Sequence, residues 1–239
     1  MDNFSFYELY YFVFMILIMV YIWFGARNIY NKEYTDFEIR SLHYDEIQTG
    51  DILLVTYSDP VTIFNQAIIS MQFIHAALCS REGSNVYVYE FGNYFGKKVG
   101  FLKLTFSEWI KYNKNSLIMM NKLKIQDDSI NKRKQLSLKL NNFRENNMSD
   151  IDYSFLDFMG RYLIPTREYK QFDNTKTDYA CYELVLNMLK EIEIIDDMKA
   201  TETYVTDDMI GMKKFNLKEE YSYDEYFIAD INSLKFISD

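Results

Sequence analysis

The sequence predicts an α+β domain that follows an N-terminal transmembrane helix. The β-rich runs gather within residues 47–125, whereas the longer helical patterns come after residue 128, and this segregation is typical of α+β folds. Hydrophobic residues make up 49% and aromatic residues 18% of the chain, which is enough to bury a sizeable core. Residues 9–26 contain neither a charge nor a proline. These three observations define the expected architecture.

The N-terminal hydrophobic segment, 9–26, is long enough to span a bilayer as a helix. A cleaved signal peptide and a buried core helix are the competing interpretations. Asp2 and Glu8 precede the segment without any lysine or arginine, whereas Arg27 and Lys32 follow it. The first feature argues against a signal peptide. The positive-inside rule then predicts a single-pass membrane protein with its C-terminal domain on the cytosolic side.

Three segments follow from this pattern. Residues 1–27 form the expected anchor, 28–46 a polar linker and 47–239 the folded domain. The linker carries His43, for which a surface position is expected because no partner pattern surrounds it.

The expected strands are apolar, β-branched or aromatic runs separated by turn residues. Gly50 marks the turn before the first run, and Gly83 with Ser84 separates two runs that read as a hairpin. The predicted strands cover 52–56, 73–80, 85–92, 99–104 and 116–125.

The expected helices combine capping residues with apolar residues at helical spacing. Pro60 after Asp59 suits a first helical turn, Ser107 is the expected cap of the second helix, and Asp207 or Asp208 opens the last. The predicted helices cover 60–72, 106–114, 128–147, 154–163 and 206–212, together with a helix that carries Cys181 in its first turn.

Cys181 raises the question of a nucleophilic thiol. A helix N-terminus lowers a thiol pKa through its unpaired N–H groups and its dipole, but a cysteine at such a place is more often a packing residue. The backbone N–H of Cys181 is a candidate for part of an oxyanion hole. The other cysteine, Cys79, lies in an apolar run and suits an inert buried thiol. Two cysteines are too few for a disulfide framework, and a reducing compartment is the simpler interpretation.

His75 and Glu90 could supply the base and the orienting group that a nucleophilic thiol needs. Alternation along 73–80 places His75 on one face with Ala77 and Cys79. Glu90 ends the next β-rich run, at a comparable distance from the hairpin turn. Taken singly, His75 suits a satisfied core histidine and Glu90 an exposed strand end. The order of histidine, glutamate and cysteine on strand, strand and helix favours a site.

These residues resemble the circularly permuted NlpC/P60 papain-like superfamily, in particular its YiiX-like and poxviral branch. The resemblance covers about 47–212, and its motifs are short, so that their order carries it. A later segment, 204–212, is also similar to that branch, although Thr206 stands where the family usually has proline. The matching motifs are 50–51 (GD), 75–78 (HAAL), Glu90 and 179–185 (YACYELV).

The resemblance implies an antiparallel sheet packed with helices and a catalytic Cys181, His75 and Glu90. It implies a thiol hydrolase, a peptidase, amidase or lipid-acyl hydrolase, that works through an acyl-enzyme. An acyltransferase on lipids and a non-catalytic membrane-tethered binding or virion structural protein are the alternatives. Tyr179 would line the substrate site or simply pack. The Asn-, Tyr-, Ile- and Lys-rich composition suits a large DNA virus, whose host or virion membrane would hold the anchor.

The expected partners are a membrane, through residues 9–26, and a peptide or lipid acyl substrate. A net charge of −9 argues against broad nucleic-acid binding, which depends on neutralised phosphates. No cofactor is expected, and no metal site, because the ligand-type residues lack paired spacing.

Overall fold

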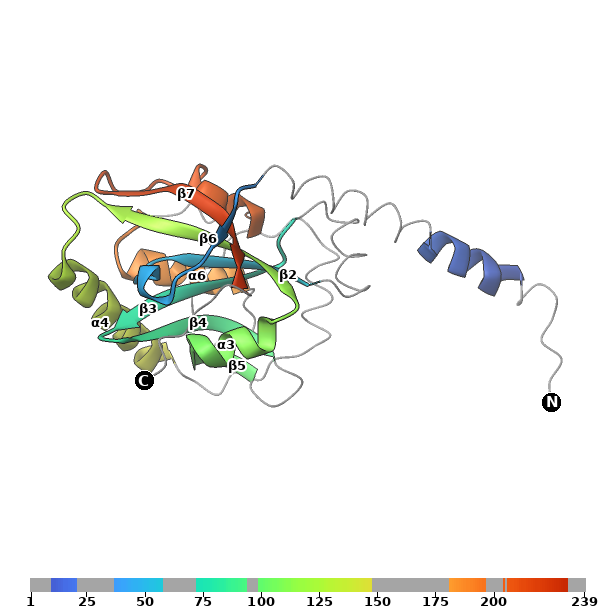
Figure 1. Ribbon diagram of the computed structural model, residues 1–239, viewed down its shortest axis with the longest axis horizontal. Helices are drawn as coiled ribbons and strands as arrows, with labels where there is room; N and C mark the ends of the chain where they lie inside the picture. The colour runs from blue at the N-terminus through green and yellow to red at the C-terminus, as the bar shows by residue number, and fades with distance from the viewer. Residues whose placement is uncertain are drawn as a thin grey trace.

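The computed structural model describes residues 10–20, 37–57, 72–93, 99–147, 181–196, 204 and 206–231. Its centre is a seven-stranded sheet of order β1-β7-β6-β2-β3-β4-β5. The β1–β7 pair is parallel and the other neighbours are antiparallel, so the sheet is mixed (Figure 1). The strands are β1 (Ile39–Ser41), β2 (Ile52–Tyr57), β3 (His75–Glu82), β4 (Asn85–Asn93), β5 (Val99–Thr105), β6 (Ser116–Ile125) and β7 (Tyr221–Asp230).

Within the described residues, three α-helices and two short 3-10 helices accompany the sheet. They are α3 (Phe106–Asn113), α4 (Ile130–Asn147) and α6 (Cys181–Glu191), with η2 (Tyr44–Glu46) and η3 (Thr206–Met212). A further helical stretch covers residues 10–20. The helices predicted at 60–72 and 154–163 lie almost entirely outside the described residues.

The predicted strands of the first half are found close to their expected positions. The segment 116–125 forms β6 over its whole length, and β3 and β4 form the expected hairpin around Gly83, whose φ of +65° suits a tight turn. The cap of α3 is Thr105 and not Ser107, since Thr105 and Glu108 form a reciprocal capping box.

Two strands were not predicted from the sequence. β1 lies within the segment expected to be a linker, and β7 follows the last predicted helix. β7 pairs with both β1 and β6 and so joins the N-terminal strand to the rest of the sheet. Pairing between segments so distant in sequence leaves no local signal, and β1 is too short to show alternation.

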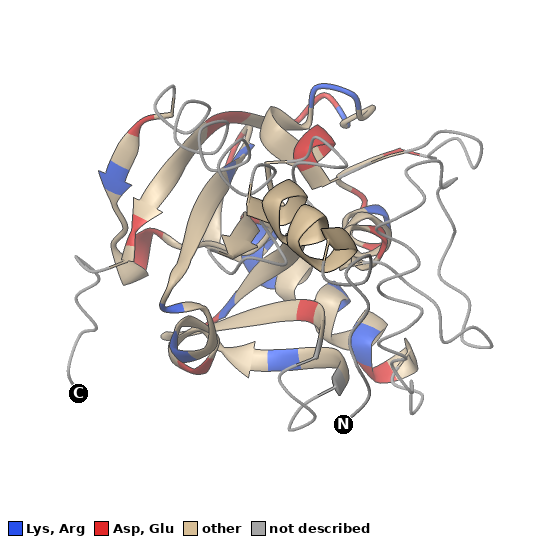
Figure 2. Ribbon diagram, turned by 90° about the vertical axis from the view of Figure 1, so that its right-hand side faces the viewer, with Lys and Arg blue, Asp and Glu red and all other residues tan. Residues whose placement is uncertain are grey.

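The fold class therefore differs from the prediction in two respects. The sheet is mixed rather than antiparallel, because β1 runs parallel to β7. Among the described residues, no helix is long and apolar enough to cross a bilayer. The helical residues 10–20 carry no charged side chain (Figure 2) and are mostly exposed. The predicted transmembrane helix over 9–26, and with it the single-pass membrane localisation, is wrong.

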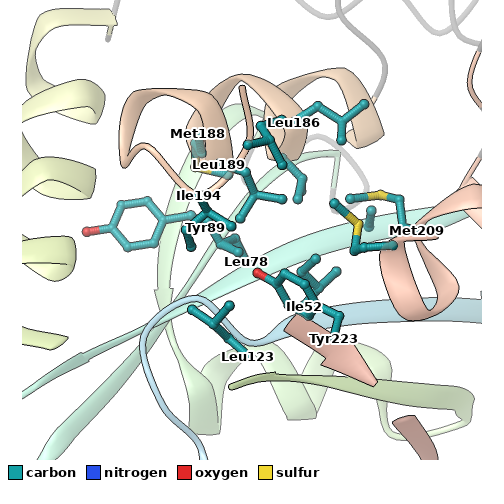
Figure 3. Packing of buried hydrophobic residues seen from close by; sticks show 14 of the residues in the cluster. Ile52, Leu78, Tyr89, Leu123, Leu186, Met188, Leu189, Ile194, Met209 and Tyr223 are labelled. Carbon is teal, nitrogen blue, oxygen red and sulfur yellow. The ribbon is translucent and has the colours of Figure 1, made fainter. Parts of the chain in front are cut away.

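Hydrophobic side chains cover both faces of the sheet. On one face, residues such as Leu54, Leu78 and Tyr89 pack against α4, α6 and η3 (Figure 3). On the other face, Val55, Ala77 and Val88 belong to a second cluster, which includes the buried side chains of α3. Successive side chains of a strand point to opposite faces. The membership of these two clusters therefore shows which face each strand residue occupies.

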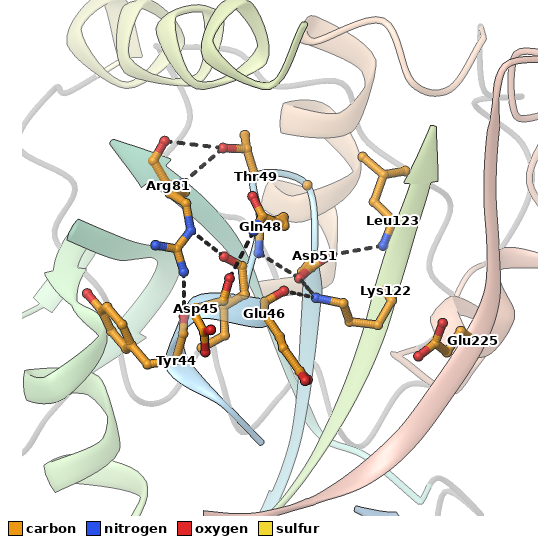
Figure 4. Close-up of polar contacts among 12 residues, drawn as sticks. Tyr44, Asp45, Glu46, Gln48, Thr49, Asp51, Arg81, Lys122, Leu123 and Glu225 are labelled. Atoms are coloured by element: carbon orange, nitrogen blue, oxygen red, sulfur yellow. Dashed lines mark hydrogen bonds and ion pairs between the residues drawn. The ribbon is translucent and has the colours of Figure 1, made fainter. Parts of the chain in front are cut away.

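A buried polar network holds the start of β2. Asp51 accepts hydrogen bonds from the backbone N–H of Gln48 at 2.8 Å and of Leu123 at 3.0 Å, and it forms an ion pair with Lys122 (Figure 4). Gly50 has a φ of +94°, and a Cβ there would meet Leu123 Cδ2 at 2.3 Å. The Gly50–Asp51 pair is thus required by a close backbone approach and by buried donors.

Replacement of Asp51 by alanine should lower the free energy of unfolding by about 3–5 kcal/mol, because it leaves Lys122 charged and poorly hydrated and two backbone donors without their acceptor. Urea unfolding followed by circular dichroism measures the loss. The control is Lys124→Ala on the same strand, which removes only exposed pairs with Asp224 and Glu225. Equal stability of the Asp51 variant and wild type would contradict a structural role for this network.

Candidate active site

His75 is the first residue of β3 and lies opposite Val55 of β2. It shares a face with Ala77 and Cys79, as alternation predicts, and this is the face that α3 covers. Only 9% of the residue is exposed. The imidazole is therefore placed at the end of a buried strand, where a polar partner is needed.

Glu90 supplies that partner from the neighbouring strand. In the register of the hairpin Glu90 lies opposite Ala77, so its side chain projects from the same face as that of His75, one diagonal step away. Glu90 Oε2 lies 2.8 Å from His75 Nε2. The carboxylate is fully buried. Glu90 is not the exposed strand end that its position in the sequence alone would suggest.

Trp109 of α3 completes this arrangement and was not identified from the sequence. Its indole Nε1–H donates to the same oxygen, Glu90 Oε2, at 2.8 Å. The capping box of Thr105 and Glu108 starts α3 directly before it. The spacing of Phe106 and Trp109, three residues apart, is typical of a buried helical face. It gives no sign that the indole bonds to Glu90.

The two partners of Glu90 Oε2 show how the histidine ring is oriented. An indole N–H can only donate, so Oε2 is an acceptor. His75 Nε2 therefore donates a hydrogen to Oε2, and Nδ1 is the ring nitrogen that remains for proton exchange with a thiol.

Cys181 is the first residue of α6, and only 7% of it is exposed. Its Sγ–H donates to the backbone carbonyl of Ile74, with 3.6 Å between sulfur and oxygen. Ile74 immediately precedes His75, so the thiol lies at the start of β3. α6 packs on the sheet face opposite α3, and its first residue, Cys181, lies near the histidine at the end of the strand.

The pKa of His75 reflects both neighbours. Burial by itself lowers the pKa of the ring, but the charge and hydrogen bonding of Cys181, followed by those of Glu90, raise it to about 10. Cys181 and Glu90 therefore both lie close enough to the imidazole to raise its pKa. Burial has the opposite consequence for Cys79, whose pKa it raises well above the ordinary value, so this thiol stays protonated.

The structure thus brings Cys181, His75 and Glu90 together. Tyr179, predicted to line the substrate site, lies outside the described residues. The role of the Cys181 N–H in an oxyanion hole stays a prediction. His43, expected at the surface, is exposed. In the described part of the chain, no group of three or more His, Cys, Asp or Glu residues could hold a metal ion.

Comparison with known proteins yields one distant structural likeness to report. No family model and no curated protein matches the sequence. The crystal structure of the metalloprotein YiiX from Escherichia coli O157:H7 is similar, with a TM-score of 0.41 and 14% sequence identity over 64% of this chain and 72% of that chain. This is a weak likeness to a YiiX-like fold. Membership of the permuted NlpC/P60 superfamily and a viral source stay predictions.

The shared hydrogen bonds on Glu90 can be tested by a double-mutant cycle. We expect Trp109→Phe and Glu90→Gln to be coupled by about 1–3 kcal/mol in the free energy of unfolding, because Trp109→Phe keeps an aromatic ring and removes one charge-assisted hydrogen bond. Urea unfolding of the wild type, both single variants and the double variant measures the coupling. Additivity within about 0.5 kcal/mol would mean that the indole N–H does not support the carboxylate.

Proposed function

We propose that this protein is a cysteine acyl hydrolase in which Cys181 is the nucleophile, His75 the general base and acid, and Glu90 the orienting group. The observation that carries the proposal is a buried imidazole that lies 2.8 Å from the Glu90 carboxylate and next to Ile74, whose carbonyl accepts from the Cys181 thiol. Cys181 is also close enough to raise the pKa of that imidazole. A nucleophile, a base and an orienter gathered in this way are the groups that activate a thiol.

The chemistry follows from the donors and acceptors. His75 takes the thiol proton, and the resulting thiolate attacks the carbonyl carbon of an amide, ester or thioester. The imidazolium then gives its proton to the leaving group as the tetrahedral intermediate collapses to an acyl-enzyme. Water, deprotonated by His75, attacks the acyl carbon and releases the carboxylic acid and the thiol. Glu90 stabilises the imidazolium that forms in each half of the cycle.

A peptide and a lipid acyl group both fit this mechanism as substrates. An acyltransferase would use the same acyl-enzyme and replace water by another acceptor. A binding protein on this fold would bind without forming an acyl-enzyme. Product analysis separates the first two functions, and the absence of a covalent intermediate identifies the third.

Replacement of Cys181 should abolish covalent labelling. We expect a thioester or activated-ester acyl probe to label the wild-type protein and Cys79→Ala, but not Cys181→Ala. His75→Ala should label about 10²–10⁴ times more slowly, which is the usual contribution of a general base. Intact-mass spectrometry measures each rate. Cys79→Ala is the matched control, because it removes a buried thiol from the face of β3 that also carries His75. Persistent labelling of Cys181→Ala would exclude Cys181 as the nucleophile.

The raised pKa of His75 predicts the alkaline limit of activity. The imidazolium that protonates the leaving group is lost as the pH rises through about 10, so hydrolysis should fall near that pH and not near about 6.5, the ordinary histidine value. Glu90→Gln removes a charge that raises this pKa, and the alkaline limb should move to lower pH. The pH dependence of kcat/KM on an activated ester measures the alkaline limb of the wild type and of the variant. An unchanged alkaline limb in the variant would contradict the role of Glu90.

A further inference from the structure

A carboxylate of η3 accepts two backbone hydrogen bonds from the chain just before His75. Asp207 Oδ2 accepts a hydrogen bond from the N–H of Gln72 at 2.5 Å, and Oδ1 accepts one from the N–H of Phe73 at 2.7 Å. We propose that Asp207 is a positioning residue of the site, which sets the backbone that presents both the Ile74 carbonyl and His75 to Cys181. This inference rests on the proposed function.

The three backbone N–H groups that precede His75, those of residues 72 to 74, are all hydrogen-bonded. Asp207 takes the first two N–H groups, and the N–H of Ile74 donates to Val55 O at 3.1 Å. The next residue is His75, which opens β3. The carbonyl of Ile74 receives the Cys181 thiol. A displacement of residues 72 and 73 is therefore transmitted directly to the thiol acceptor and to the imidazole.

η3 is itself fixed to the centre of the sheet. The fully buried Asn121 of β6 donates through Nδ2 to Met209 O at 3.1 Å, and its Oδ1 accepts from Gly211 N at 3.2 Å. Met209 is fully buried in the cluster that includes α6. Asp207, which is half-buried, thus belongs to a segment that the core holds. Through η3 it connects β6 to the residues just before β3.

The geometry requires a carboxylate at this position. Two successive N–H donors need two acceptor oxygens, and a carboxylate offers both, whereas the amide of asparagine offers one acceptor and turns a donor toward the second N–H. Asp208, the next residue, faces a different partner and pairs with Lys214. Asp208 is therefore a matched control in the same short helix.

The test measures how fast iodoacetamide alkylates Cys181 between pH 5 and pH 10, with the adduct quantified by peptide mass spectrometry. Asp207→Asn should weaken the thiolate–imidazolium pair, because His75 is no longer held close to Cys181. We expect the midpoint of the alkylation profile to rise by about one pH unit, so that alkylation below the wild-type midpoint slows about tenfold. Alkylation well above both midpoints should stay unchanged, since the thiolate is then fully formed.

Two variants define the comparison. Asp207→Glu retains both oxygens on a longer side chain and should give a midpoint between those of wild type and Asp207→Asn. Asp208→Asn should keep the wild-type midpoint. Thermal unfolding of each protein distinguishes a general loss of stability, which lowers the Tm without moving the midpoint. If Asp207→Asn does not fold, the comparison of Asp207→Glu with Asp208→Asn decides the question.

The outcomes are separable. A wild-type midpoint in folded Asp207→Asn, or in Asp207→Glu when the asparagine variant does not fold, overturns the positioning role and leaves the proposed thiol site standing. A wild-type profile no different from that of His75→Ala shows that His75 does not activate Cys181. That result overturns the proposed function and this inference together.

Discussion

The hydrogen bond between His75 Nε2 and Glu90 Oε2 is the interaction on which the candidate site depends. A fully buried carboxylate is costly unless its oxygens are hydrogen-bonded, and Oε2 receives both the imidazole and the Trp109 indole. The same contacts place a hydrogen on His75 Nε2 and orient the other ring nitrogen. One set of hydrogen bonds therefore satisfies the buried carboxylate and holds the imidazole as the base for a thiol.

The site is assembled from both faces of the sheet. His75, Glu90 and Trp109 lie on the face covered by α3, whereas Cys181 comes from α6 on the opposite face. They meet because His75 is the first residue of its strand and the carbonyl of Ile74, directly before it, accepts from the thiol. This junction explains the proposed influence of Asp207 on the thiol, since Asp207 binds the N–H groups of Gln72 and Phe73 just before it.

The far end of the same strands has a different function. Asp51, Lys122 and the neighbouring backbone groups satisfy one another around the start of β2, opposite the Cys79 part of β3. They hold β2 and β6 in place without contacting the thiol site. The strands β2 and β3 therefore connect the Asp51 network at one end of the sheet to the candidate thiol site at the other. Their paired residues run from Ile52 with Leu78 to Val55 with His75.

The sequence by itself determined the strands from β2 to β6, the helix of Cys181 and the three residues that meet at the candidate site, because alternation, hairpin turns and helical spacing are local patterns. The tertiary structure decided that β7 pairs antiparallel with β6 and β1 parallel with β7. It also decided that Trp109 shares the Glu90 oxygen, and that Asp207 rather than Asp208 binds the backbone before His75. It also overturned the transmembrane helix, which composition alone had predicted. The strand pairings and these hydrogen bonds depend on partners far apart in the chain, which no local pattern of residues encodes.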